Sequence, residues 1–180
     1  MNAPIRRMTV GDRVPNFMLE DADGVRRELY NTDLTGGPIV LLVAGQQTEA
    51  CLQQFAAQAA LSERFGAHCY ALLDRQTPTV AASADQAGFM LLCDPGATVC
   101  NAYLQTSGLA APALFALDPN QRIVSAAGAD NVDSFSELAH AACERIAPQY
   151  PPRLISQQAP VLFIPEVLDD AECDTLIEAW

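Results

Sequence analysis

The chain has 180 residues, half of them hydrophobic, which is the composition of a folded protein with a sizeable core. It carries 22 acidic residues against 10 arginines and no lysine, and the formal net charge of -12 argues against binding to nucleic acid or to anionic lipid. No apolar run reaches transmembrane length, and no apolar stretch of a signal peptide follows the two arginines near the N-terminus. We therefore expect a cytoplasmic protein.

The N-terminal half predicts a β-hairpin followed by alternating strands and helices. Residues 10–19 alternate loosely between apolar and polar, and the turn residues 21–24 separate them from a partner strand at 25–29. Residues 39–44 are apolar throughout, as in a central strand that is covered on both faces. A helix is predicted from Thr48 to about Phe65. The elements expected next are a buried strand at 68–73 and a helix that begins near residue 77.

The pattern continues with a strand at 89–93, a short helix at 97–104 and a strand at 113–117. The turn sequence 118–121 predicts a hairpin to an antiparallel strand at 122–126. Ser134 and Glu137 have the spacing of a capping box at the start of a helix that ends near residue 146. This alternation predicts an α/β fold with a mixed, mostly parallel central sheet flanked by helices.

The character of the chain changes after residue 147, and we interpret the chain as three parts. Residues 1–147 form one domain, residues 148–157 are a proline-rich linker, and residues 158–180 are the truncated start of a second domain. An acidic helix that begins near residue 169 is expected to bury Cys173, Leu176 and Ile177.

The cysteines and histidines are not spaced as a metal site. None of the six cysteines lies in a CxxC pair, and only His68 and His140 could add imidazole ligands. We expect no metal and no cofactor in this segment, and buried thiols with one reactive thiol among them. The cysteines are Cys51, Cys69, Cys93, Cys100, Cys143 and Cys173, of which Cys69 and Cys143 suit core positions.

The order of the segments over residues 8–146 resembles peroxiredoxins of the alkyl hydroperoxide reductase and thiol-specific antioxidant type. Residues 10–19 are similar to that family's opening segment, and residues 89–103 and 115–120 are similar to its later segments. The apolar strand that leads to Thr48-x-x-Cys51 is similar to the family's active-site strand. The resemblance implies a thioredoxin-like fold with the peroxiredoxin-type N-terminal β-hairpin. It also implies an antioxidant oxidoreductase that reduces hydroperoxides with a thioredoxin-like or small-thiol reductant, and it is compatible with a homodimer.

Cys51 is the candidate reactive thiol because of its place in the predicted helix. Thiolate is the form that reduces peroxide, so the site must lower the pKa of the thiol. With Thr48 as N-cap, Cys51 takes the third helical position, where free backbone N–H groups and the helix dipole favour an anion. A second thiol would resolve the resulting sulfenic acid, and Cys93 and Cys100 are the candidates. The alternative is that Cys51 is a small buried hydrophobic residue.

Two positions differ from the family pattern. Ala44 stands where the family has a proline, and Pro112 stands where it has the arginine that holds both sulfur and peroxide. A proline at this place resembles thioredoxin-like reductases, which usually carry it as a cis-proline beside the reactive cysteine. Arg122 is a remote candidate for the missing guanidinium, and Glu49 would raise the thiol pKa. A second function therefore stays open, that of a degenerate, non-peroxidase accessory or sensing module.

Residues 160–177 resemble the N-terminal lead-in of prolyl-hydroxylase-like oxygenases that depend on 2-oxoglutarate and Fe(II). That family binds iron with an HxD pair and a distant histidine, and neither His68 nor His140 is followed two residues later by an acid. Iron and 2-oxoglutarate would then be cofactors of an oxygenase domain that follows residue 180. In this reading the accessory module would serve that oxygenase.

Overall fold

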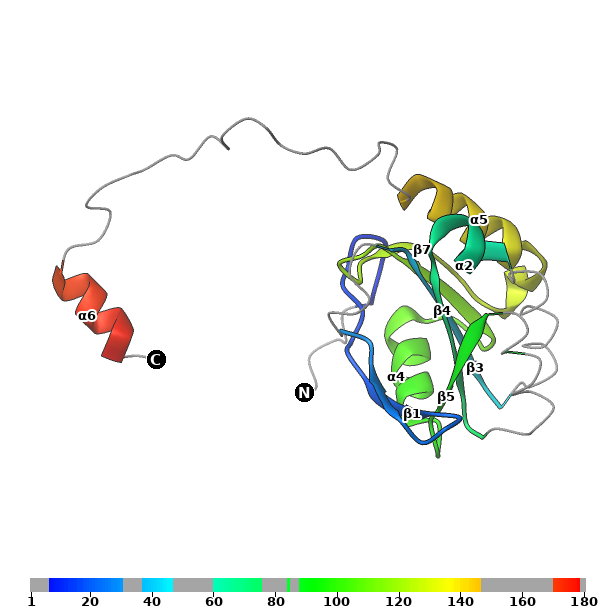
Figure 1. Ribbon diagram of the computed structural model, residues 1–180, viewed down its shortest axis with the longest axis horizontal. Coiled ribbons are helices and arrows are strands. Elements are labelled where there is room, and N and C mark those ends of the chain that lie inside the picture. The colour runs from blue at the N-terminus through cyan, green and yellow to red at the C-terminus, as the bar shows by residue number, and fades with distance from the viewer. Residues whose placement is uncertain are drawn as a thin grey trace. The chain divides into compact units, whose positions relative to one another are not determined.

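The computed structural model describes residues 7–30, 37–46, 60–75, 84, 88–146 and 170–178. The chain divides into two compact units, Met1–Ala147 and Pro148–Trp180. The described residues of the first unit form a seven-stranded sheet with helices, and those of the second form the helix α6 (Asp170–Glu178) (Figure 1). The predicted helix from residue 77 and the linker at 148–157 lie outside the described residues, apart from Ala84.

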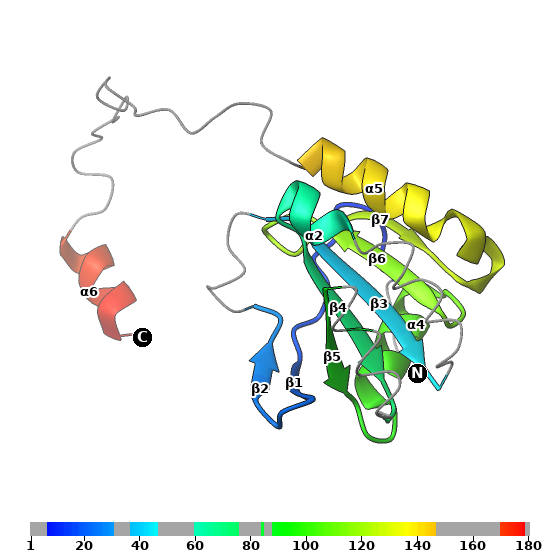
Figure 2. The same cartoon turned by 45° about the vertical axis from the view of Figure 1, so that its right-hand side comes forward.

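The strands of the sheet follow the spatial order β2-β1-β5-β4-β3-β6-β7 (Figure 2). The first hairpin, β1 with β2, and the last hairpin, β6 with β7, are formed as the turn sequences predict, and they lie at the two edges of the sheet. The bounds are β1 (Met18–Asp21), β2 (Arg26–Glu28), β3 (Ile39–Gly45), β4 (His68–Leu73), β5 (Phe89–Cys93), β6 (Ala113–Leu117) and β7 (Ile123–Ala127).

The prediction that this sheet is mostly parallel is wrong. The pairs β3–β4 and β4–β5 are parallel, whereas β1–β2, β1–β5, β3–β6 and β6–β7 are antiparallel. Parallel neighbours need a long crossover connection, while hairpins join antiparallel neighbours. The sequence shows which strands are separated by helices, but it does not show that β1 lies beside β5 or that β6 runs against β3.

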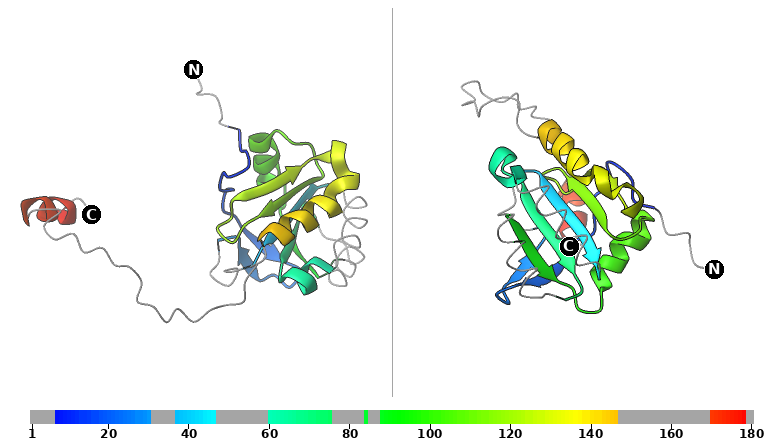
Figure 3. Two further views of the ribbon diagram at one scale, coloured as in Figure 1. Left: turned by 90° about the horizontal axis from the view of Figure 1, so that it is seen from above. Right: turned by 90° about the vertical axis from the view of Figure 1, so that its right-hand side faces the viewer.

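Helices cover both faces of the sheet (Figure 3). The helices α2 (Ala60–Phe65) and α5 (Phe135–Ile146) pack on one face, and α4 (Thr98–Ser107) packs on the other. Every residue of β3 is buried, as expected for a strand with both faces covered.

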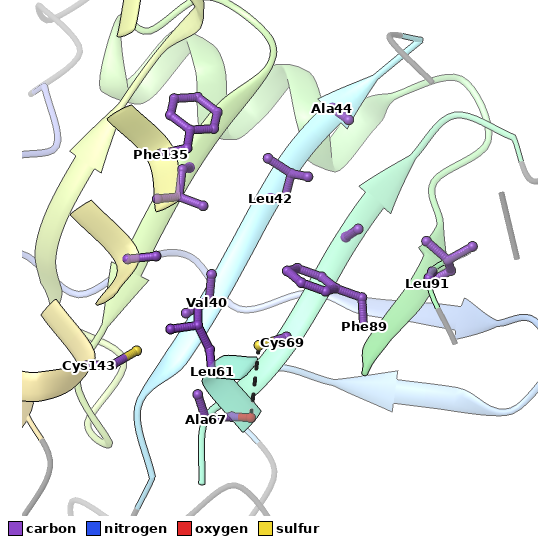
Figure 4. Close-up of a cluster of buried hydrophobic side chains, with 14 of the residues drawn as sticks. Val40, Leu42, Ala44, Leu61, Ala67, Cys69, Phe89, Leu91, Phe135 and Cys143 are labelled. Atoms are coloured by element: carbon purple, nitrogen blue, oxygen red, sulfur yellow. Dashed lines mark hydrogen bonds between the residues drawn. The ribbon is translucent and has the colours of Figure 1, made fainter. Parts of the chain in front are cut away.

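Successive side chains of the central strands point to opposite faces and so build two core clusters. The α5-side cluster includes Val40, Leu42, Ala44, Leu61, Cys69, Phe89, Leu91, Phe135 and Cys143 (Figure 4). The α4-side cluster includes Leu19, Ile39, Leu41, Val43, Tyr70, Leu92, Cys100, Tyr103 and Phe115.

The helix α5 begins at the predicted place but not through the predicted capping box. A 3₁₀ helix, η2 (Ala129–Ser134), leads directly into it. The Ser134 hydroxyl donates to the Asn131 carbonyl (2.8 Å), and the Phe135 N–H donates to the Val132 carbonyl. The 3₁₀ turn therefore satisfies the backbone at this junction.

The helix α6 confirms the predicted helix near residue 169, but its apolar residues are not buried. Leu176 and Ile177 are 57% and 73% exposed, and Cys173 is exposed. The prediction that this helix buries them is wrong for the described residues, which include no other element of this unit against which the helix could pack.

Candidate active site

The parallel strands β3, β4 and β5 have their carboxyl ends side by side, and we call this side of the sheet the carboxyl edge. The segment that carries Cys51 follows β3 at the carboxyl edge. Gly45 pairs with Leu73, and Leu73 pairs with Cys93. Gly45 has φ 60°, a left-handed conformation that glycine adopts without steric cost. Thr48 and Cys51 follow Gly45 closely in sequence, but both lie outside the described residues.

Pro112 lies at this same carboxyl edge. Ala113 pairs with Val43, so the residue before β6 stands beside Ala44 at the end of β3. The Ala111–Pro112 peptide bond is cis, the geometry implied by the resemblance to thioredoxin-like reductases. The two positions that differ from the peroxiredoxin pattern, Ala44 and Pro112, are therefore neighbours in space.

Arg122 does not supply the missing guanidinium at this edge. It precedes β7, whose Ile123 pairs with Leu117, and Leu117 pairs with Ile39 at the opposite end of β3. Its guanidinium donates to the Gly11 carbonyl (2.9 Å). The interpretation of Arg122 as a remote candidate is therefore wrong, because the antiparallel direction of β6 places its turn far from Pro112.

Arg75 is an arginine that does lie at the carboxyl edge. It follows Asp74, whose N–H donates to the Gly45 carbonyl (3.0 Å). Its guanidinium is 3.9 Å from the Asp74 carboxylate, and its side chain is 83% exposed. Our sequence reasoning missed Arg75, although its position just after a buried strand was a usable signal.

Cys93, the first candidate resolving thiol, is the last residue of β5. It is half-buried, and its thiol lies 3.8 Å from the Asp74 carbonyl oxygen. By strand alternation it points to the same face as Phe89 and Leu91, which belong to the α5-side cluster.

Cys100, the second candidate, is the third residue of α4 and lies in the α4-side cluster. Its N–H donates to the buried carboxylate of Asp94 (2.8 Å), and its thiol lies 3.8 Å from the Leu72 carbonyl oxygen. Burial, with a further contribution from Asp94, raises the pKa of the Cys100 thiol to about 12, while the backbone of Gly45 acts in the opposite direction. The two candidate thiols thus reach the carboxyl edge from opposite faces of the sheet.

Cys69 and Cys143 occupy core positions, as expected. Both are buried in the α5-side cluster (Figure 4). Burial raises the pKa of Cys69 to about 12 and that of Cys143 to about 11, so neither is a thiolate near neutral pH.

We expect the thiols to react with an alkylating reagent in the order of their exposure. In a short pulse of iodoacetamide at pH 8 on the reduced, folded protein, Cys173 and Cys93 are labelled before Cys69, Cys100 and Cys143, because reaction requires an accessible thiolate. Tandem mass spectrometry of the tryptic peptides gives the order, because fragment ions distinguish Cys93 from Cys100 on their shared peptide, 76–122. The same pulse in urea, where every thiol reacts, is the control. Labelling of Cys100 as fast as that of Cys173 would contradict the described burial.

The described residues contain no group of three histidine, cysteine or acidic side chains that could hold a metal ion. None of the helices described is long and apolar enough to span a membrane.

The sheet order and the helices on both faces define a protein of thioredoxin-like fold. Three solved structures are similar to it. A thiol:disulfide interchange protein DsbE of Chlorobium tepidum is 20% identical, covers 76% of this chain and 99% of its own, and has a TM-score of 0.58. The peroxidoxin BcpB of Mycobacterium tuberculosis is 21% identical with coverages of 78% and 99% and a TM-score of 0.60. Peroxiredoxin Q of Xanthomonas campestris is 16% identical with coverages of 73% and 92% and a TM-score of 0.55.

The family is given by the sequence itself. The profile of the AhpC/TSA family matches residues 10–126, and the chain belongs to this family. The predicted thioredoxin-like fold and the peroxiredoxin resemblance are confirmed, and the family supports a thiol-based redox function. A comparison with curated proteins finds no match.

Proposed function

We propose that this protein is a thiol peroxidase of the peroxiredoxin type, with Cys51 as the thiol that attacks a hydroperoxide. The observation that carries the proposal is the AhpC/TSA match, which includes the Thr48-x-x-Cys51 sequence directly after β3. Pro112 also lies at the carboxyl edge, after which this sequence follows β3. The thiols of Cys93 and Cys100 lie near the same edge, on opposite faces of the sheet.

In the proposed reaction the Cys51 thiolate attacks one peroxide oxygen and the O–O bond breaks. The sulfur becomes a sulfenic acid, and the other oxygen leaves as alcohol or water after it takes up a proton. A second thiol then attacks the sulfenic sulfur, which forms a disulfide and releases water. A thioredoxin-like protein or a small thiol reduces that disulfide by exchange.

The resolving thiol is either Cys93 or Cys100, and the two differ in how far the structure must open before the thiol can react. Cys93 is half-buried at the end of a strand, so its thiol can attack the Cys51 sulfenic acid without opening of the core. Cys100 is buried in the first turn of α4, so this turn would have to open before a disulfide forms. Peptide mapping after one equivalent of peroxide separates a Cys51–Cys93 from a Cys51–Cys100 disulfide.

We expect Cys51→Ser to lower the rate of hydrogen peroxide consumption by about 100-fold or more, because the attacking atom is removed. The assay follows peroxide loss with dithiothreitol as reductant, and Cys173→Ser, a change at an exposed thiol of the second unit, is the matched control. If the wild type and Cys51→Ser consume peroxide equally slowly, the peroxidase proposal fails.

A second function is favoured by one observation, that Ala44 and Pro112 replace two family residues at the same strand edge. In this alternative the domain is a non-peroxidase accessory or sensing module for an oxygenase domain that would follow residue 180 and bind Fe(II) and 2-oxoglutarate. Titration of the Cys51 thiol distinguishes the two functions. A pKa at or above the free value of about 8.5 favours the accessory module, and a lower value favours the peroxidase.

A further inference from the structure

A hollow of about 410 Å³ lies between the first hairpin and the starts of β4 and β5. Figure 2 shows these four neighbouring strands, β2, β1, β5 and β4, in one part of the sheet. The side chains of interest in its lining are Asp21, Asp23, Arg27, His68, Tyr70 and Met90. We propose that this hollow is a binding site for a small organic molecule that carries a single carboxylate group on an apolar body.

Arg27, Tyr70 and His68 of the hollow project from one face of the sheet, whereas Ser62 of α2 lines it from the other. Arg27 stands opposite Leu19, and residues directly opposite in an antiparallel pair share a face. Leu19 and Tyr70 both belong to the α4-side cluster, so Arg27 and Tyr70 project to the same side. His68 lies two residues before Tyr70 in β4 and follows it to that side.

Three hydrogen-bonding groups in the hollow are available to a ligand. The Arg27 Nε donates to Asp21 Oδ2 (2.8 Å), which fixes the guanidinium, and within the described part of the chain its two Nη groups make no hydrogen bond. No hydrogen bond to the Tyr70 hydroxyl or to the His68 ring is found among the described residues, and Tyr70 is 8% exposed. Burial raises the pKa of Tyr70 to about 12, so its hydroxyl stays protonated and can donate.

The charges around the hollow select the class of ligand. A guanidinium with free Nη groups matches the two oxygens of a carboxylate, and the Tyr70 hydroxyl adds a third donor. Asp21 and Asp23 lie beside Arg27, so a ligand with two or more negative charges would be repelled. Met90, which packs on the α4 side, and the ring of Tyr70 provide apolar surface for the rest of the molecule, and the volume lies in the range of small-molecule sites.

The hollow is separate from the end of β3, after which the Cys51 segment begins. Asp21 and Arg27 are level with the end of β5, and His68 lies at the start of β4. The first hairpin is separated from β3 by the strands β5 and β4. The proposal therefore does not depend on the chemistry of Cys51.

The test is a titration of the isotope-labelled full chain with phenylacetate, followed by NMR of the Arg27 Nε–H and of the Tyr70 and His68 amides. We expect saturable shifts, at least about tenfold weaker binding for Arg27→Gln, and a similar loss for Tyr70→Phe, which removes only the hydroxyl. Arg26→Gln is the matched control, because Arg26 is the neighbouring residue of the same strand, points to the other face and is exposed. It should bind as tightly as the wild type.

Two ligand controls complete the test. 2-Phenylethanol has a similar apolar body without the carboxylate, and inorganic phosphate carries more negative charge; both should shift these signals far less than phenylacetate. Shifts that rise linearly without saturation, equal binding by Arg27→Gln and Arg26→Gln, or equal binding of phenylethanol or phosphate would each overturn the proposal. Tyr70→Phe keeps the test decisive if Arg27→Gln disturbs the hairpin.

Discussion

Replacement of Phe115 by alanine is expected to lower the free energy of unfolding of the first unit by about 3–5 kcal/mol. Phe115 lies in β6, is 0% exposed, and meets the ring of Tyr103 edge to face with centroids 5.7 Å apart. The change removes this apolar contact and leaves a cavity between β6 and α4. Because domains are stable by only about 5–15 kcal/mol, the loss is a large part of the total.

Urea unfolding in the presence of reductant, followed by circular dichroism, measures this loss. Met18→Ala is the matched control, because Met18 is in β1 and is 58% exposed, so its removal should change the stability by about 0.5 kcal/mol or less. A loss below about 1 kcal/mol for Phe115→Ala would show that β6 is not packed as described.

Alkaline pH is expected to destabilise the first unit steeply above about pH 9. Burial raises the thiol pKa from 9.0 to about 12 at Cys69 and Cys100, and to about 11 at Cys143. Above pH 9 the unfolded chain therefore loses thiol protons that the folded domain keeps, and the unfolded state is favoured. The stabilising contribution is fully present below pH 9 and is lost as the pH rises toward 12, by up to about 1 kcal/mol per pH unit for each buried thiol.

The composition of the chain leaves few other groups that titrate between pH 9 and pH 12. The chain contains no lysine, and its 10 arginines stay protonated, so thiols and tyrosines dominate the titration in this window. Buried Tyr70 acts in the same direction, because burial raises its pKa from 10.0 to about 12. The free energy of unfolding is measured in urea with reductant at several pH values between 7.5 and 11.

Cysteine variants show which thiols cause the loss of stability at alkaline pH. Cys143→Ala should make the fall with pH shallower, because one buried titrating group is gone, even though the variant is less stable at neutral pH. Cys173→Ala is the control and should leave the slope unchanged, because that thiol is exposed. A stability that is constant from pH 9 to pH 11 in the wild type would contradict the burial of these thiols.

Most individual strands could be predicted because their signals are local. The strands at 39–45, 68–73, 89–93 and 113–117 are short apolar runs between turn residues, and each is found within one residue of its predicted bounds. The segment 10–19 was less well predicted, since β1 covers only Met18–Asp21. Before β1 the chain makes irregular contacts with a distant turn, where the Val14 N–H donates to the Gln121 carbonyl (3.0 Å). Such a contact leaves no periodic signal in either segment.

The candidate site was predicted in its parts but not in its arrangement. The sequence alone indicated that Pro112 takes the place of the family arginine and that Cys93 and Cys100 are additional thiols. It could not show that Asp94 holds the first turn of α4 through the Cys100 N–H, because a cap from outside the helix depends on how the chain returns from β5. For the same reason the sequence does not indicate the hollow beside Arg27.

The amino-acid sequence by itself determined the strands, the two hairpins, the helix at 135–146 and the AhpC/TSA relationship, because apolar periodicity, turn residues and motif order are properties of neighbouring residues. Only the tertiary structure decided which strands lie side by side and in which direction they run. That order places Ala44 beside Pro112 and places Arg122 at the opposite end of the strands. It also puts Cys93 and Cys100 on opposite faces of the sheet. Strand order and direction are set by how two helical layers cover one sheet, a property of the whole chain that no local pattern contains.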